Sequence, residues 1–150
     1  MLSYEVCDAI ADSVIPVLAV AALLVPWVSR PFRPRVACLQ NLLALGAVAI
    51  AYGEQAIDNA FHLWPRMGMD YSGHTALFAA VASSLWQQGI PWRWVSIIVG
   101  VAYAGLMLYQ RYHTLADIVT TAAVVIPVLT AYWVAVRRAG NVIVPATPTG

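Results

Sequence analysis

Five long apolar segments make up most of the chain and limit the folds open to it. They are Ser13–Val28, Val36–Tyr52, Ser72–Gln88, Trp94–Tyr109 and Ile118–Val136. A helix needs about 17–25 mostly apolar residues to cross the hydrocarbon core of a bilayer, and each segment comes close to that length. Alanine and leucine occur throughout without the alternation that strands of a membrane barrel show. We therefore expect an all-α integral membrane protein, a bundle of about five transmembrane helices.

The overall composition favours the same class. Apolar residues make up 61% of the chain and charged residues only 10%, whereas soluble domains carry about 45–50% and 25%. No internal repeat or linker divides the sequence. We expect one transmembrane catalytic domain over residues 1–140 and a flexible C-terminal tail over residues 141–150, where small and polar residues dominate.

The arginines predict an orientation. All eight basic residues are arginines, and with five spans six of them fall on one side, namely Arg30, Arg33, Arg35, Arg93, Arg137 and Arg138. The other side holds the acidic N-terminus and only Arg66 and Arg111. Because cytoplasmic loops are enriched in basic residues, we expect the N-terminus outside and the C-terminus in the cytoplasm, as in a bacterial inner membrane. Nucleic-acid binding would need a stripe of basic residues, and the sequence has none.

Two polar clusters fall on the predicted external, or periplasmic, side. The second cluster contains His113 and Asp117, whose spacing of four places them on one face of a helix. A carboxylate bonded to one imidazole nitrogen fixes the tautomer and raises the basicity of the other, which suits a nucleophile or base. The alternative is a helix-surface pair that stabilises its turn by a few tenths of a kcal/mol.

The first cluster, Ser72-Gly73-His74-Thr75, lies where the third apolar segment begins. Free amides and the positive end of a helix dipole form a natural phosphate site there. Gly73 allows close approach of the backbone, Ser72 and Thr75 offer hydroxyls, and His74 can protonate a leaving oxygen. The alternative is ordinary helix capping by Asp70 or Ser72.

Arg66 and Arg111 accompany the two clusters and supply the forked cations that phosphate recognition needs. Polar residues at membrane depth are candidates for function. The three histidines of the chain, His62, His74 and His113, form no convincing set of metal ligands, so we predict no metal and no cofactor.

A third feature is acidic. Glu54, Asp58 and His62 repeat every four residues and share a predicted helical face that extends toward the clusters. This face is suited to binding a headgroup or to accepting a proton from an incoming alcohol, or else it is a solvated interfacial helix. Asp70 is either a helix cap or a participant of the same kind.

The two clusters together resemble the motif pair of the type 2 phosphatidic acid phosphatase (PAP2) superfamily. Arg111, two residues before His113, makes the second motif most similar to the sphingomyelin-synthase branch. The resemblance implies that His113, held by Asp117, attacks phosphorus and forms a phosphohistidine-type intermediate. It also implies that His74 protonates the leaving alcohol and then activates the acceptor, without a metal.

The acceptor stays open. The phosphatase branch carries a Lys-containing motif, and this chain has no lysine; where that branch has an arginine six residues before the nucleophile, Met107 stands here. Water as acceptor makes a lipid phosphatase and a lipid alcohol makes a phosphotransferase, acting on a phospholipid or lipid phosphate in either case. A non-catalytic lipid-binding scaffold or small carrier is the alternative from another class.

Overall fold

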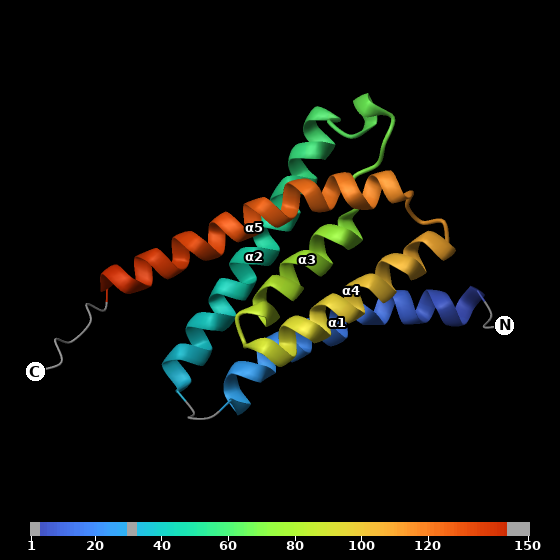
Figure 1. Cartoon of the computed structure of the whole chain (residues 1–150). Coiled ribbons are helices and arrows are strands. Elements are labelled where there is room, and N and C mark those ends of the chain that lie inside the picture. Colours follow the sequence, from blue (N-terminus) through green and yellow to red (C-terminus); the bar gives the residue numbers. More distant parts are fainter. Residues whose placement is uncertain (1–3, 30–32, 144–150) are drawn as a thin grey trace, which may run out of the picture.

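The computed structural model describes residues 4–29 and 33–143, and its regular elements in this part of the chain are all helices. They are α1 (Tyr4–Val28), α2 (Pro34–Phe61), the short 3-10 helix η1 (Pro65–Met67), α3 (Gly73–Trp86), α4 (Ile90–Tyr109) and α5 (Leu115–Ile143). Figure 1 shows the α-helices as an elongated bundle. The expected all-α class and the presence of five α-helices are confirmed for the described residues, but α3, with 14 residues, is shorter than the transmembrane segment expected there.

Four helices, α1, α2, α4 and α5, are long and apolar enough to cross a membrane. Their outer faces expose large apolar side chains, and Val17, Leu42 and Val101 are each more than 60% exposed. Apolar surface of this extent is costly in water, at about 25 cal/mol for each Å². Contact with lipid removes that cost, so the described bundle has the surface of a helical membrane protein.

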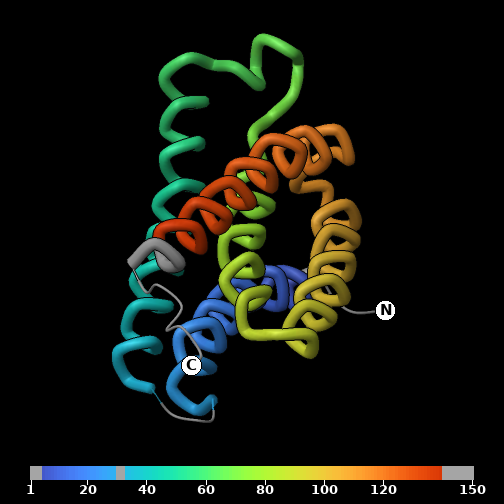
Figure 2. Tube along the Cα trace, turned by 60° about the vertical axis from the view of Figure 1, so that its left-hand side comes forward, coloured from blue at the N-terminus to red at the C-terminus, as the bar shows by residue number. Residues whose placement is uncertain are grey.

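The remaining helix, α3, is the shortest with 14 residues and occupies the centre of the bundle. It packs against all four other helices, and α4 and α5 lie on either side of it (Figure 2). Small side chains allow the closest approach, since Ala47 and Ala51 of α2 and Ala76 and Ala80 of α3 are almost fully buried in one cluster. Small residues at the contact are typical of helices packed within a membrane.

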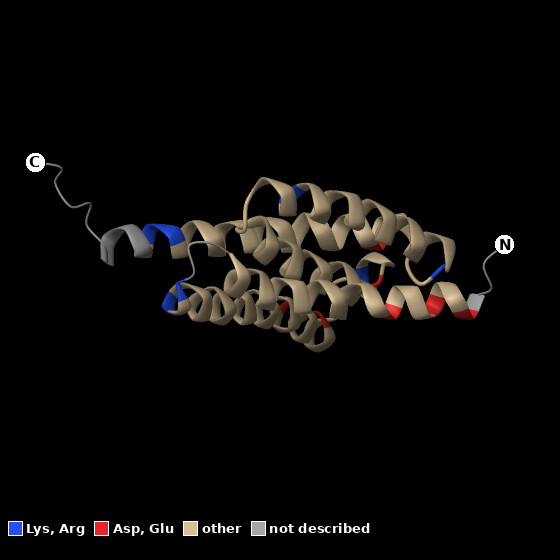
Figure 3. Ribbon diagram, turned by 90° about the horizontal axis from the view of Figure 1, so that it is seen from below, with Lys and Arg blue, Asp and Glu red and all other residues tan. Residues whose placement is uncertain are grey.

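The connections divide between two ends of the bundle. The N-terminal end, as we call it, holds the start of α1 and residues 62–72 and 110–114, and the opposite end holds the α1–α2 and α3–α4 connections (Figure 1). Acidic segments of α1 lie at the N-terminal end, where some basic positions also lie, and further basic segments lie at the opposite end at the start of α2 and late in α5 (Figure 3). Arg30, which entered the predicted charge asymmetry, lies outside the described residues.

Four helices, α1, α2, α4 and α5, are longer than the apolar segments that predicted them, and α4 begins at Ile90 rather than Trp94. α1 begins at Tyr4 rather than Ser13, and α2 continues to Phe61 rather than Tyr52. Glu5 lies in the first turn of α1, where an acidic residue interacts favourably with the helix dipole. α5 continues to Ile143, past the start of the expected tail, and residues 144–150 of that tail lie outside the described residues.

Candidate active site

Hydrogen bonds join the segments that precede α3 and α5 at the N-terminal end. The amide of Ser72 donates to Oγ1 of Thr121 at 3.0 Å, and the amide of Asp70 donates to Oδ1 of Asp117 at 2.8 Å. Ser72, Asp117 and Thr121 are all buried. The two motifs, nearly forty residues apart in the chain, are therefore fixed side by side.

The two motif histidines face each other in this arrangement. His74 is the second residue of α3, and His113 lies in the connection between α4 and α5. Their ring centroids are 6.0 Å apart and the ring planes are inclined by 61°. This distance allows one small group to contact both imidazoles. The predicted position of both motifs on the same side of the membrane had led us to expect that they come together.

The expected helical pairing of His113 with Asp117 is wrong. α5 begins at Leu115, so His113 lies before the helix and the spacing of four does not place the two residues on one helical face. The Asp117 carboxylate instead accepts hydrogen bonds from the amide and the hydroxyl of Thr114, both at 2.8 Å. The amide of Asp117 donates back to Oγ1 of Thr114 at 3.2 Å. This reciprocal pair is a capping box at the start of α5.

The surroundings of His113 favour its neutral form. Its Nδ1 atom is buried and has no hydrogen-bond partner, so no bond joins it to Asp117 within the described structure. Burial, and secondly the neighbouring His74, lower the pKa of His113, while the charges of Asp117 and Asp70 oppose that shift. A neutral imidazole near neutral pH is the form that acts as a nucleophile.

Ser72 is the N-cap of α3, as the capping alternative predicted. Its Oγ accepts from the amide of Thr75 at 3.3 Å and lies 2.8 Å from the Thr75 hydroxyl. The amide of Gly73 donates to the carbonyl of Tyr71 at 3.1 Å. Among the first three amides of α3, only that of His74 has no acceptor within the described chain. The start of α3 therefore offers fewer free amides to a phosphate than an uncapped helix would.

Gly73 does allow a close approach, but the neighbour is another helix. A Cβ atom at this position would lie 3.3 Å from the side-chain nitrogen of Gln55 on α2. The missing side chain therefore brings the start of α3 against the end of α2.

A polar cavity of about 340 Å³ adjoins His113. The late part of α2 and the loop that follows it form most of its wall, which consists of Gln55, Asp58, Asn59, His62, Pro65, Asp70, Tyr71 and His113. Asp58 and His62 thus share this cavity with His113, as the predicted acidic face required. The lining includes two carboxylates and no arginine, so the cavity is suited to water, hydroxyl groups or cations.

Asp58 also has a structural role. It is buried, and its Oδ1 accepts from the amide of Trp64 at 2.9 Å. The indole of Trp64, buried in turn, donates to Oγ1 of Thr120 on α5 at 3.1 Å. These bonds fold the loop after α2 back onto α5. Nothing in the local sequence around Trp64 indicated this role.

Glu54 reaches the cavity through Tyr71. The Tyr71 hydroxyl lies 3.4 Å from Oε2 of Glu54, and α2 runs through both Glu54 and Asp58, which confirms their shared helical face. Burial, and secondly the charge of Glu54, raise the pKa of Tyr71. Tyr71 therefore stays protonated and is a hydrogen-bond donor at the cavity wall.

The two arginines expected to bind phosphate are exposed. Arg66 lies in η1 and Arg111 follows α4, and neither lines the polar cavity. Arg111 has a φ of 57°, in the left-handed region that non-glycine residues seldom adopt. Such backbone strain is common at functional sites. Within the described residues, no hydrogen bond joins either guanidinium to the histidine pair.

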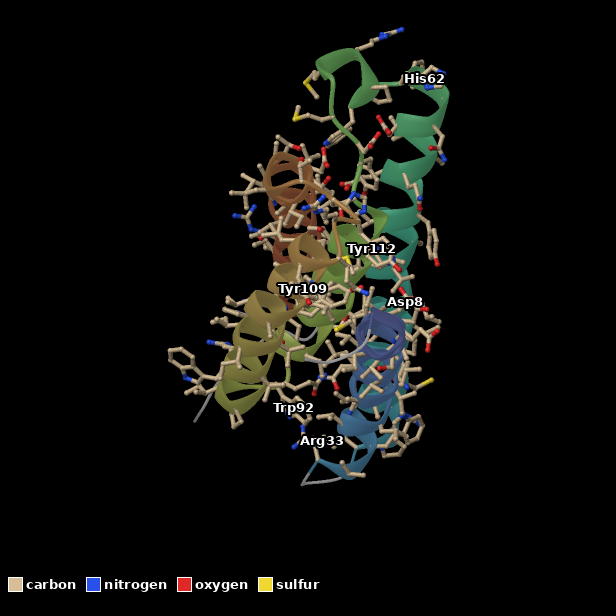
Figure 4. All side chains as sticks on the ribbon, turned by 90° about the vertical axis from the view of Figure 1, so that its right-hand side faces the viewer. Asp8, Arg33, His62, Trp92, Tyr109 and Tyr112 are labelled. Atoms are coloured by element: carbon tan, nitrogen blue, oxygen red, sulfur yellow. The ribbon has the colours of Figure 1, made fainter. Side chains whose placement is uncertain are left out.

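Tyr112 links His74 to the first helix. Its ring stacks on that of His74, with centroids 6.1 Å apart and an angle of 22° between the planes. Its hydroxyl donates to the Asp8 carboxylate on α1, and Figure 4 shows Tyr112 and Asp8 at the same level of the bundle. The adjacency of Tyr112 to His113 was a weak signal for this role, and no sequence pattern indicated Asp8.

An apolar groove of about 660 Å³ begins beside the histidine pair. It runs between α4 and α5 over α3, from Thr75, Met107 and Ile118 to Trp133 and Arg137. The groove and the polar cavity thus lie on different sides of the site.

The described residues contain no group of three His, Cys, Asp or Glu side chains that could hold a metal ion. No protein-family model matches the chain, and no curated protein or solved structure shows a significant match.

Proposed function

We propose that the protein is a membrane enzyme that transfers a phosphate-containing group from a lipid phosphate ester, with His113 as nucleophile. The observation that carries this proposal is the facing pair of His113 and His74, 6.0 Å apart between ring centroids. One imidazole is kept neutral by burial, and its partner is close enough to move a proton. The apolar surface and the adjacent apolar groove support a lipid substrate.

In the first step, Nε2 of neutral His113 attacks phosphorus, because Nδ1 is buried. An N–P bond forms as the P–O bond to the lipid alcohol breaks, and protonated His74 gives its proton to the leaving oxygen. The products are the free lipid alcohol, neutral His74 and a phosphorylated imidazolium at His113. The carboxylates of Asp117 and Asp70 stabilise that positive charge, because both favour the charged form of His113.

In the second step an acceptor hydroxyl replaces His113 on phosphorus. The acceptor gives its proton to His74 as its oxygen attacks, and the N–P bond breaks to regenerate neutral His113. If the acceptor is water, which enters from the polar cavity, the protein is a lipid phosphatase. If the acceptor is a lipid alcohol, which enters from the bilayer, the protein is a phosphotransferase.

The His74 amide and the start of α3 stabilise negative charge on the phosphoryl oxygens. Arg111 and Arg66 are exposed and bonded to no other side chain of the described structure, so they are free to turn toward a bound phosphate. Their forked guanidinium groups match phosphate geometry. This stabilisation and the positioning of the reactants supply most of the acceleration in phosphoryl transfer.

We further propose that the N-terminal end of the bundle faces the external or periplasmic side. The separation of acidic from basic segments along the bundle supports this orientation, because basic residues concentrate on the cytoplasmic side (Figure 3).

Phosphate release from phosphatidic acid in vesicles tests the function, and thin-layer chromatography with and without diacylglycerol or ceramide separates the two acceptors. We expect wild-type turnover and none from His113→Ala, whose thermal melting in detergent should match that of the wild type. If the wild type releases no phosphate and fails to bind vanadate, the protein is better explained as a non-catalytic lipid-binding scaffold or carrier.

A further inference from the structure

The apolar groove is a built feature of the bundle. α4 and α5 both pack on α3 rather than along each other within the described residues, so α3 forms the floor between them (Figure 2). The volume of about 660 Å³ lies within the roughly 300–1,000 Å³ that ligand sites occupy.

One end of the groove opens at the histidine pair. Its lining there includes Thr75 and Ile118, which directly follow His74 and Asp117 in the chain. A lipid whose phosphate lies between His74 and His113 therefore has its apolar part at the mouth of the groove.

At the other end, which we call the far end, bonds join the floor of the groove on α3 to its wall on α5. The indole of Trp133 donates to Oγ of Ser83 at 3.0 Å, and Arg137 donates to the side chain of Gln87. All four of these residues line the groove.

The groove runs along almost the whole of α3. From Thr75 to Trp86, both of which line it, α3 rises by about 16 Å at 1.5 Å per residue.

We propose that this groove holds one acyl chain of the lipid substrate and that Trp133, whose indole is held by Ser83 at the far end, limits the length of that chain. The position of the phosphate rests on the proposed function, whereas the shape of the groove does not.

Photo-crosslinking tests the occupant without requiring turnover. The probe is phosphatidic acid with a diazirine at the end of one palmitoyl chain, in phosphatidylcholine vesicles. We expect label in the peptides around Ser83 and Trp133. Ala122→Phe fills the groove from its wall, where Ala122 is half-buried. Val124→Phe is the matched control on the same helix, because the Val124 side chain is 43% exposed and lies outside the groove. Label at the far end should fall about tenfold in Ala122→Phe and stay at the wild-type level in the control.

Ala104→Phe, from the α4 wall, provides a second block if Ala122→Phe fails to fold. Both blocks should also shift turnover from palmitoyl toward short-chain substrates. Label on the outward faces of α1 and α2, or equal label in blocked and control variants, would overturn the groove proposal even if turnover is normal. Label at the far end of the groove in a protein that turns over no lipid phosphate would support the groove proposal and refute the proposed function.

Discussion

His113 is subject to opposing influences that set its protonation state. Burial and His74 disfavour the imidazolium, and Asp117 and Asp70 favour it. The net effect is a lowered pKa, so the neutral nucleophile is available near neutral pH and the opposing carboxylates still stabilise the charged intermediate. The same arrangement serves both stages of a nucleophilic reaction.

A pH dependence follows from this lowered pKa. Turnover requires neutral His113, so kcat/KM should fall only as the pH drops below about 6.5, the usual value for histidine. The acidic limb of the profile therefore lies below that value. A limb at or above it would contradict the assigned environment.

Isotope-labelled histidine observed by NMR gives a second measurement: in His74→Gln the pKa of His113 should rise, because one of the two lowering influences is removed.

The roles of Asp117 in stability and in rate can be separated by two substitutions. Asp117→Ala leaves the amides of Thr114 and Asp70 without their acceptor, which should lower the free energy of unfolding by about 1–3 kcal/mol. Asp117→Asn removes the charge and keeps one of the two acceptor oxygens, so the amide of either Asp70 or Thr114 loses its bond. We expect it to be less destabilised than Asp117→Ala and to turn over about tenfold more slowly or worse, since a unit charge a few ångströms away contributes about 1–4 kcal/mol.

Unfolding in detergent and initial rates on the same preparations measure both effects. An Asp117→Asn protein with the wild-type rate would show that the carboxylate acts only as a helix cap.

At the scale of the elements, α2 and α5 approach closely at Gly46. The Tyr132 hydroxyl donates to the carbonyl of Leu43 at 2.9 Å and occupies the space that a Cβ atom of residue 46 would need. Gly46→Ala should therefore displace Tyr132 and lower the free energy of unfolding by about 1–3 kcal/mol. Gly53 on the same helix has nothing near its missing Cβ, so Gly53→Ala should stabilise by about 0.5–1 kcal/mol. Equal effects of the two substitutions on thermal melting would contradict this packing.

The sequence predicted the apolar bodies of the helices well and their ends poorly. Hydropathy reports which residues tolerate lipid, whereas a helix ends where its backbone groups find other partners. α2 continues through the polar turn at Glu54 and Asp58, and α5 begins only after its capping residue Thr114. The Thr-x-x-Asp pattern of that capping box is present in the sequence, and it explains why His113 does not share a helix with Asp117.

The candidate site was predictable only in part. Both histidines belong to short motifs at helix starts, and their common side followed from counting spans. The contacts that complete the site come from segments far apart in the chain, as Tyr112 does with Asp8 and Trp64 with Thr120. No local pattern encodes such pairings, because they depend on how the helices pack.

The whole molecule places a polar cavity and an apolar groove on two sides of one histidine pair. This arrangement fits an amphipathic ester held at the surface of a bilayer. Figure 4 shows Asp8 and Tyr112 far along the bundle from Arg33 and Trp92. The reaction is therefore expected at one membrane face only.

The orientation is tested by fusions at the C-terminus in a bacterial inner membrane. With the C-terminus in the cytoplasm, a green fluorescent protein fusion should fluoresce and an alkaline phosphatase fusion should be inactive. The opposite pattern would place the histidine pair on the cytoplasmic side.

Covalent phosphorylation of His113 is the step on which the proposed function depends, and trapping it is the most direct test. Phosphatidic acid carrying radioactive phosphorus is mixed with the protein in vesicles, quenched rapidly in alkali and digested for mass spectrometry. We predict alkali-stable, acid-labile label on the peptide that contains His113, and neither label nor turnover in His113→Ala. Sustained turnover by the His113→Ala protein, or rapid turnover with no label on that peptide, would contradict a phosphohistidine mechanism.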